Sequence, residues 1–341
     1  MSHTRTLPVL VKKQFRLDDL FTDTSDSSAD DLEPETLRKQ ARWIRDELDP
    51  MVSRHGPNSL KPDQVVMVFK FLELLRRSRV SIEHIRYSRL HMAISCISNT
   101  ATRWPRLVID EADKLLENWT TRYGDIREIG IVLYEEGGRL FGVCAPHDIS
   151  KEVLEVKWSR APGSRTASGF SRRHGDLGFK PGDWWINCMF AYHAGIIDSG
   201  IPSGRIISDR HGAYALVLNG WDELDSPDPN AFTYKAKSNE PGRFRLTSAT
   251  SASRQPIRVL RTHSLHSFWA PRAGIRYDGL YKVSGWSVRH SPTTNLWTYA
   301  IHFQRLSSEP PMAIALRHPL AEEVDDYTEF KRLRGLTRQA Q

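Results

Sequence analysis

The sequence predicts an α+β protein in which an N-terminal α-helical bundle is followed by a strongly curved, largely antiparallel β-barrel domain. Residues 62–123 carry apolar side chains at helical spacing throughout. After residue 174, apolar and β-branched runs are separated at short intervals by Gly, Pro, Asn and Asp, which is typical of antiparallel strands that close into a barrel. A chain of 341 residues is long enough to bury two separate cores.

We expect five regions along the chain. They are a mostly disordered acidic leader over residues 1–49, the helical bundle over 50–124, a connecting segment and linker over 125–173, the β domain over 174–308, and a charged tail over 309–341. Every charged residue between Leu17 and Leu37 is acidic, and like-charge repulsion at low hydrophobicity favours disorder. The best candidate linker is the stretch 159–174 (SRAPGSRTASGFSRRH), which is rich in Gly, Ser and Arg and has no periodicity.

The bundle begins with an apolar stripe and continues through shorter helices. The expected helices follow Pro62, start at the capping residue Ser81, and cover Leu90 to Ile97 and Ile109 to Trp119, with a short helix in the leader over Glu35 to Leu48. The order of apolar residues resembles the N-terminal helical domain of the transcription elongation factor that rescues stalled RNA polymerase. That resemblance implies a domain that docks a protein partner. A plain structural bundle is the alternative, since any bundle needs apolar residues at such offsets.

The strands that we expect in the β domain share β-branched or aromatic residues between turn signals. They cover residues 184–190, 214–218, 257–260, 280–283 and 297–303. Residues 321–338 are charged and are expected to form a surface helix or a tail.

Charge is distributed unevenly along the chain. The net charge is +7, and from Lys151 to Leu320 there are 22 Lys and Arg against 13 Asp and Glu. A basic C-terminal half points to a polyanionic partner, although a solvated basic surface is an equal alternative.

Several functions are disfavoured by what the sequence lacks. The three cysteines, Cys96, Cys144 and Cys188, are far apart and have no metal-ligand spacing, which argues for a reducing compartment and against a structural zinc. No apolar run approaches bilayer length and no secretory signal is evident, so we expect a soluble intracellular protein without a membrane partner. No P-loop or GxGxxG is present, and the sequence implies no cofactor and no metal. His263 and His266 could share a metal, but surface histidines are the favoured interpretation.

Six short motifs follow one another in the β domain. They are Pro181 to Trp185, Gly195-Ile196, Gly212 to Leu218, Phe232 to Tyr234, Pro256 to Arg261, and Arg276 to Val283, which contains Tyr277-Asp278-Gly279. In this order they resemble the YDG or SRA family of modified-cytosine binding domains over roughly residues 174–306, about two-fifths of the chain. The resemblance implies a PUA-like barrel that binds double-stranded DNA, in particular methylated CpG, and rotates 5-methylcytosine into a protein pocket.

The resemblance implies a base pocket around the turn that follows residue 218. Tyr234 falls where the family has one of its two stacking tyrosines, and Asp225 where it has the carboxylate that accepts from the exocyclic amine of cytosine. A core tyrosine and a turn-capping aspartate are the respective alternatives. The remaining pocket residues of this prediction are Asn219, Gly220, Trp221, Asp222 and Lys235.

This chain departs from the family pattern at that turn. Asp222 replaces the second stacking tyrosine, and Trp221 lies one position earlier. Trp221 either takes over the stacking role or fills the cavity and blocks it. Lys235-Ala236 replaces a Thr-Gly pair, which removes a glycine where backbone would approach a ligand closely.

Two loops of the family enter the duplex, and their counterparts supply the expected DNA contacts. Ile196 and Ile197 are candidates for an apolar wedge that replaces lost stacking. The second loop is shortened to KSNEPGRFR, which puts discrimination between hemimethylated and fully methylated sites in doubt. The cationic candidates for phosphate contacts are Lys235, Lys237, Arg243, Arg245, Arg254 and Arg258. Asp278 is expected to have a structural role at a turn into a strand, with Gly279 where a side chain would not fit.

These observations predict a non-enzymatic nuclear protein with a chromatin or epigenetic role. Its SRA-like domain would read modified cytosine by base flipping, and its helical bundle would recruit a protein partner. The alternative is an interaction scaffold with the SRA fold and a blocked base pocket, which binds DNA non-specifically or not at all. A third hypothesis is a nuclease whose carboxylates lie between Asp222 and Asp228.

Overall fold

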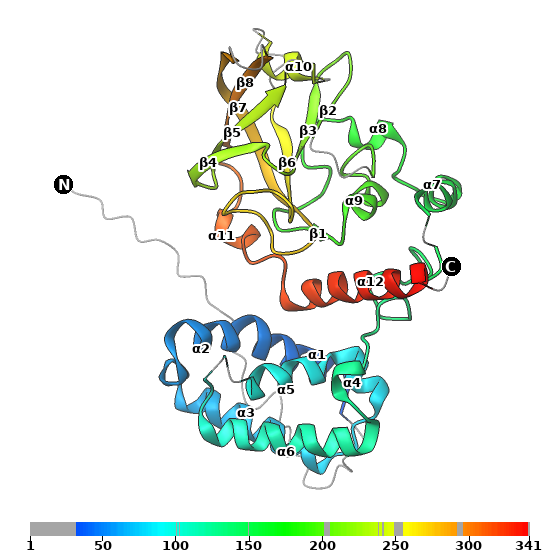
Figure 1. Cartoon of the computed structure of the whole chain (residues 1–341), viewed down its shortest axis with the longest axis vertical. Helices are drawn as coiled ribbons and strands as arrows, with labels where there is room; N and C mark the ends of the chain where they lie inside the picture. Colours follow the sequence, from blue (N-terminus) through cyan, green and yellow to red (C-terminus); the bar gives the residue numbers. More distant parts are fainter. Residues whose placement is uncertain are drawn as a thin grey trace, which may run out of the picture. The chain divides into compact units, whose positions relative to one another are not determined.

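A computed structural model describes residues 32–99, 101, 103–148, 150–200, 205–237, 239–240, 242–248, 255–291 and 296–339. The chain divides into two compact units, residues 1–129 and 130–341 (Figure 1). The disorder expected for the acidic leader concerns residues that, up to residue 31, lie outside the described ranges.

The first unit is entirely helical where it is described. Its elements are α1 (Pro34–Trp43), the π-helix η2 (Ile44–Leu48), α2 (Asp49–His55), the 3₁₀-helix η3 (Pro57–Ser59), α3 (Pro62–Arg77), α4 (Ile82–Ser88), α5 (Leu90–Ser98), α6 (Arg106–Tyr123) and η4 (Ile126–Glu128). Ser81 caps α4 as predicted, because its hydroxyl accepts a hydrogen bond from the backbone N–H of His84 at 3.2 Å.

The helical unit begins earlier than residue 50. Leu37, Ala41, Ile44 and Leu48 recur at helical spacing on α1 and η2, and all four are buried in the same core as Leu72. The segment that the sequence placed in the leader is therefore part of the bundle from residue 34 onward, because its apolar face completes the core.

The second unit is built on one sheet with helices at its ends and on one side. Its helices are α7 (Lys151–Arg160), α8 (Ser168–Ser171), α9 (Cys188–Ala194), α10 (Arg243–Thr247), α11 (Met312–Ala315) and α12 (Ala321–Gln339). Its strands are β1 (Trp184–Trp185), β2 (Arg205–Ser208), β3 (Ala213–Leu218), β4 (Glu223–Asp228), β5 (Ala231–Lys237), β6 (Ile257–Thr262), β7 (Ile275–Ser291) and β8 (Leu296–Arg305).

The strand order is β2-β3-β6-β7-β8-β5-β4, and β1 pairs with β7 (Figure 1). All pairs are antiparallel except β3 and β6, which run parallel because β4, β5 and α10 intervene in the chain between them. The expected largely antiparallel curved sheet is confirmed.

Both faces of the central strands are covered, and their residues alternate between two cores. On β6, Val259 faces the barrel interior with Phe232, while Leu260 faces an outer layer with Ala191 and Ile197. This double burial explains why every residue of β3 and β6 is buried.

The strand expected over residues 184–190 is wrong beyond Trp185. The side-chain oxygen of Asn187 accepts hydrogen bonds from the backbone N–H groups of Met189 at 2.9 Å and Phe190 at 3.3 Å. This cap starts α9, which ends at Gly195 with φ of 83°. A polar residue between apolar ones fits a strand pattern equally well, so the sequence alone did not separate the two.

The connecting segment and the C-terminal tail pack onto the β-rich unit. Leu133, Leu154 and Trp158 share a core with Trp184 of β1 and with Phe330 of α12. The compact unit therefore extends well beyond residues 174–308, because both flanks contribute apolar side chains to it.

The acidic side chains of α12 also bury against this unit. Arg139 donates a 2.6 Å hydrogen bond to Asp326, whose exposed fraction is 1%. Because its carboxylates pair with residues far away in the sequence, the highly charged α12 packs on this unit and is not a solvated tail.

Candidate nucleic-acid interface

The turn between β3 and β4 is held by hydrogen bonds on all sides. The backbone N–H of Asn219 donates to the Asp222 carboxylate at 2.9 Å, and the Asp222 carbonyl accepts from the N–H of Lys235 at 2.7 Å. Gly220 has φ of 54°, and its carbonyl accepts from the N–H of His266 at 2.7 Å. The structure thus brings these predicted pocket residues together, with Asp222 acting as the anchor of the turn.

Trp221 stands on the outside of this turn. Its side chain is 73% exposed, and its ring stacks on that of His266 with centroids 4.0 Å apart and planes 15° apart. The indole therefore does not fill the barrel, and the alternative in which Trp221 fills and blocks the cavity is wrong. The imidazole covers one face of the indole and leaves the other to solvent.

Tyr234 lies below the turn and is sealed in the core. It is 1% exposed, and its hydroxyl donates to the carboxylate of Glu240. Burial, followed by the charge of Glu240, raises the pKa of Tyr234 above its ordinary value. In this conformation its ring cannot stack on a base, so it occupies the position of the core tyrosine that was the alternative interpretation.

Asp225 lies on β4, beyond Leu224 whose side chain is 41% exposed. The β4 to β5 pairing is irregular between Leu224 and Asp228, so the ladder is broken at this position. The side chain of Asp225 lies outside the described part of the structure. On the facing strand β5, Lys235 is exposed.

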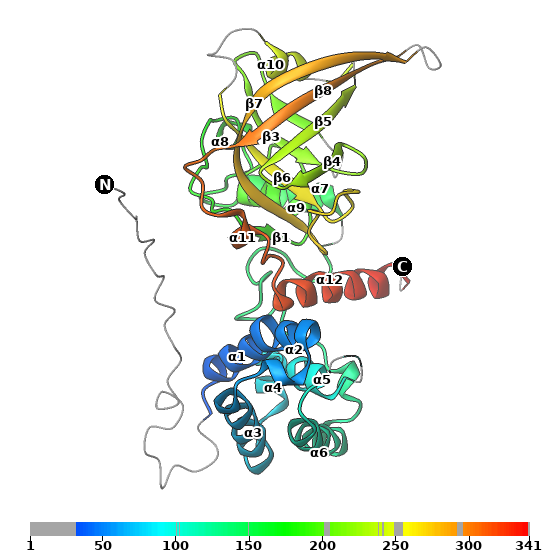
Figure 2. The same cartoon turned by 90° about the vertical axis from the view of Figure 1, so that its left-hand side faces the viewer.

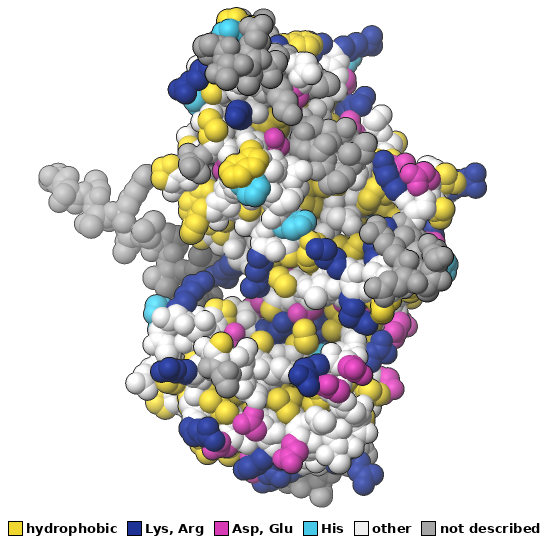
Figure 3. All heavy atoms as spheres, viewed as in Figure 1, with side chains coloured by type: hydrophobic (Ala, Val, Ile, Leu, Met, Phe, Trp, Pro, Cys, Tyr) yellow, Lys and Arg dark blue, Asp and Glu magenta, His cyan; other side chains and the backbone are white. Residues whose placement is uncertain are grey.

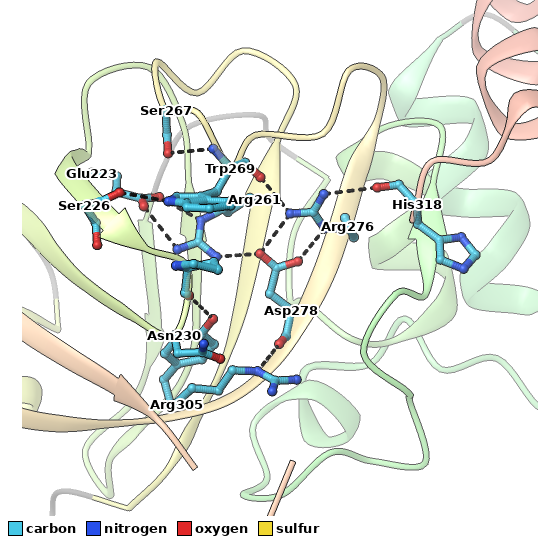
Figure 4. A network of polar contacts seen from close by, with 12 residues as sticks. Glu223, Ser226, Asn230, Arg261, Ser267, Trp269, Arg276, Asp278, Arg305 and His318 are labelled. Carbon is cyan, nitrogen blue, oxygen red and sulfur yellow. Dashed lines mark hydrogen bonds and ion pairs between the residues drawn. The ribbon is translucent and has the colours of Figure 1, made fainter. Parts of the chain in front are cut away.

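A network of buried charges fills the barrel behind this turn (Figure 4). Arg261 donates to both carboxylate oxygens of Glu223, at 2.7 Å and 3.1 Å, and to Asp278 at 2.5 Å. Arg276 donates to Asp278 at 2.5 Å and to the backbone carbonyl of Trp269 at 2.7 Å. Two guanidinium groups thus face two carboxylates in a fully desolvated cluster.

Asp278 is the centre of that cluster. Burial by itself would raise its pKa, but the charges of Arg276 and Arg261 hold the pKa below its ordinary value. The structural role predicted for Asp278 therefore agrees with its position, although it does not lie at a turn. It is the extra residue of a bulge within β7, opposite Val259 and Leu260, and Gly279 follows with φ of 110°.

Three predicted DNA contacts are buried in the protein instead. Ile196 and Ile197 are 0% and 2% exposed and pack in the outer core, so neither is placed to act as a wedge. Arg258 is 0% exposed, and its guanidinium donates to the carbonyls of Arg173 at 2.7 Å and Gly175 at 2.8 Å. It binds the loop that follows α8 and cannot reach a phosphate, because Arg258 faces the covered outer side of β6.

The other cationic candidates lie elsewhere on the β-rich unit. Arg243 and Arg245 are half-buried on α10, and the guanidinium of Arg243 lies 3.6 Å from the ring centroid of Tyr299. Arg254 and the side chain of Lys237 lie outside the described part of the structure.

Sequence reasoning missed two residues that shape this region. Glu240 lies in a loop whose other charged residues are basic, so the sequence pattern pointed to cations. Its carboxylate accepts a hydrogen bond from Tyr234. His266 was considered only for its spacing from His263, whereas its role is to stack on Trp221. The sequence feature that could have predicted this stack is an aromatic residue next to a turn glycine, Trp221 after Gly220, together with a second ring further along the chain.

Charge and metal-binding side chains give few further constraints. On the face of the β-rich unit that Figure 3 shows, Lys and Arg side chains are scattered among hydrophobic ones and form no single patch. Within the described ranges, no group of three His, Cys, Asp or Glu side chains is placed to hold a metal ion. No helix among the described residues is long and apolar enough to cross a membrane.

No family model matches the chain. The chain is 28% identical over 159 residues to a UHRF1-like protein of Cryptococcus neoformans, covering 40% of this chain and 46% of that protein. This chain therefore matches about half the length of that relative.

Two solved structures are also similar. One is the modification-dependent TagI restriction endonuclease, with 21% identity, a TM-score of 0.33, and coverage of 40% of this chain and 53% of that chain. The other is the SUVH5 SRA domain in complex with hemimethylated CG DNA, with 17% identity, a TM-score of 0.32, and coverage of 39% of this chain and 92% of that chain.

Proposed function

We propose, from the SRA/YDG domain in the β-rich unit, that the protein is a nuclear DNA-binding protein that recognises modified cytosine, above all 5-methylcytosine in methylated CpG. The helical unit recruits a protein partner to the bound DNA. The pairing of a reader with a recruiting unit gives the protein a role in chromatin.

The observation that carries this proposal is the exposed Trp221 on a turn that is itself rigid. A base rotated out of the duplex loses a few kcal/mol of stacking and pairing energy. A stack on an aromatic ring returns about 1–3 kcal/mol. The turn holds Trp221 in place through Asp222 and His266, so little ordering entropy is lost when a base binds to the free face of the indole.

Asp225 supplies the edge recognition in this proposal. It lies on β4, which begins two residues after Trp221, and a carboxylate accepts from the N4 amine of cytosine, which thymine lacks. Tyr234 supports the turn from below, and its bond to Glu240 keeps it from entering the site as a second stacking ring. The base therefore lies on the outer pair of rings rather than between two tyrosines.

We propose binding without catalysis. Of the carboxylates that could form a hydrolytic site, Asp222 is used by the turn and Glu223 is paired with Arg261 in the buried network. Asp228 accepts hydrogen bonds from the backbone and side-chain nitrogens of Asn230 at 2.8 Å and 2.9 Å, which leaves Asp225. A nuclease would need at least two of these groups to be free for a metal ion. The likeness to an endonuclease thus does not extend to chemistry at this turn.

The second candidate function is an interaction scaffold that keeps the fold without reading a base. The burial of Tyr234 favours it, because the SRA resemblance implies two stacking tyrosines, of which this chain buries one and has Asp222 in place of the other. The scaffold would act through its helical unit, and it would bind DNA through charge alone.

The test is a fluorescence-anisotropy titration of the full chain. The duplexes are identical except for one CpG that is unmodified, hemimethylated or fully methylated, and each is titrated at two salt concentrations. The variants are Trp221→Ala and Asp225→Asn, and the control is Phe141→Ala, which removes a ring that is 56% exposed outside the sheet.

We expect tighter binding to a methylated duplex that persists at the higher salt concentration. Trp221→Ala should weaken this binding about 5- to 150-fold, corresponding to the loss of one base stack. Asp225→Asn should remove the preference and leave the salt-sensitive background. Equal affinity of the wild type for all three duplexes would reject base recognition and favour the scaffold.

A further inference from the structure

The strands β7 and β8 continue beyond the rest of the sheet as a two-stranded ribbon. The ladder of β7 with β6 ends at Tyr281, whereas its ladder with β8 continues to the pair Ser291 and Leu296. On the other side, β8 pairs with β5 only as far as Thr298. Figure 2 shows this ribbon extending from the top of the barrel beside α10.

One face of the ribbon is aromatic and open to solvent. Opposed residues of an antiparallel ladder point to the same face, so Trp286, Val288 and Tyr299 continue the face that is buried at Ile301. The exposed fraction is 0% at Ile301, 45% at Trp286 and 53% at Trp297. The interior face of the barrel therefore continues into solvent as a row of large rings.

The charges of the ribbon have one sign. Between Lys282 and Gln304 the chain has no Asp or Glu, while Lys282 and Arg289 are exposed. At the base of the ribbon, the guanidinium of Arg243 lies against Tyr299 and extends the cationic surface onto α10. A surface that combines exposed rings with cations alone is complementary to nucleic acid, whose phosphates attract the cations and whose bases contact the rings.

We propose that this ribbon is a second DNA-contacting surface, which lies in the major groove of the same duplex whose modified base is read at Trp221. The proposal rests on the proposed function. A two-stranded ribbon fits the width of the major groove. The rings of Trp286 and Trp297 contact base edges and sugars, and Arg289, on the opposite face, contacts a phosphate.

The ribbon and the Trp221 turn make different contributions. The ribbon adds affinity for any duplex, because its cations contact the backbone and its rings do not depend on methylation. The turn adds preference for the modified base. Because of this division, an experiment can reject the ribbon as a DNA contact without rejecting base recognition at Trp221, and the reverse.

The experiment measures the affinity of the full chain for a methylated and an unmodified duplex over a series of salt concentrations, together with hydroxyl-radical footprints. The ribbon variants are Trp286→Ala/Trp297→Ala and Arg289→Gln. The matched controls are Phe141→Ala and Arg160→Gln, whose side chains are exposed on the segment around α7. Thermal unfolding checks that each variant is folded, and Arg289→Gln keeps the test decisive if the double variant is not.

We expect the double variant to bind both duplexes about fivefold or more weakly, with an unchanged ratio between them. Arg289→Gln should reduce the slope of log K against log salt by about 0.9, and both variants should shorten the footprint on the same side of the modified base. If the ribbon variants bind like the controls, the ribbon is not a DNA contact, and the reading of the base is unaffected. Loss of the methylation ratio with retained affinity would also contradict the division proposed here. A wild type without preference for the methylated duplex would instead reject the proposed function.

Discussion

The interior of the barrel and its outer rim invert the usual placement of side chains, because charged groups are buried inside and large rings are exposed at the rim. Inside, Arg261 and Asp278 are fully buried, and their polar atoms are bound by the protein itself. At the rim, Trp221, Trp286 and Trp297 expose 73%, 45% and 53% of their side chains. Arg261 and Asp278, which belong to the motifs that carry the family resemblance, therefore hold the fold, whereas the rings that we propose as DNA contacts lie at the rim.

The largest effect is expected for Asp278→Asn in the interior. The change leaves Arg261 and Arg276 with one charged partner fewer in a fully buried site. Removing one partner of a buried ion pair costs about 3–5 kcal/mol, so the free energy of unfolding of the β-rich unit should fall by that amount or the unit should fail to fold. Urea unfolding followed by circular dichroism measures it.

The matched control is Glu155→Gln on α7. Glu155 forms an exposed pair with Lys151 at 3.4 Å, and its loss should cost at most about 0.5 kcal/mol. A lowered pKa in the folded state also predicts that the stability from Asp278 is present above its unfolded pKa of about 3.9 and is lost as the pH falls below it. If Asp278→Asn unfolds like the control at pH 7, the network does not stabilise the interior.

A smaller effect is expected for Arg258→Lys. A lysine cannot span the carbonyls of Arg173 and Gly175 with the fixed fork of a guanidinium, so one or more buried acceptors lose their partner. The free energy of unfolding should fall by about 1–3 kcal/mol. The salt dependence of DNA binding by the folded variant should be unchanged, because Arg258 does not reach the surface.

A change in the salt slope for Arg258→Lys would place this residue at the rim instead of the interior. Arg289→Gln serves as the comparison, since its side chain is exposed on the ribbon and its slope is expected to change. The two variants thus compare a buried arginine that holds the fold with an exposed arginine that we propose to contact a phosphate.

The sequence predicted most of the sheet because local pattern determines strands such as β3 and β8. Alternation of β-branched and aromatic residues, bounded by Gly and Asn, is present in the chain itself. The placement of charged side chains was not predictable in the same way. Arg258 and Arg261 occur in one strand, and both are buried, because layers from distant segments cover each face of β6.

The candidate site was predicted in part for the same reason. The turn residues Asn219 to Asp222 lie together because these four residues alone connect β3 to β4. The Tyr234 hydroxyl is bound by the carboxylate of Glu240, and the exposed ring of Trp221 stacks on His266. Contacts of this kind arise from loop conformations that have no periodicity in the sequence.

The smallest effect on stability is expected for Trp221→Ala, and it tests the comparison most directly. A side chain that is 73% exposed contributes little to the free energy of unfolding, so the change should cost no more than about 0.5 kcal/mol. Trp184→Ala is the matched control, because Trp184 is 4% exposed and donates to the carbonyl of Ala273 at 2.7 Å. Its loss should cost about 3–5 kcal/mol. If urea unfolding gives similar costs for the two variants, Trp221 is part of the core rather than the rim, and the free indole face on which base recognition depends does not exist.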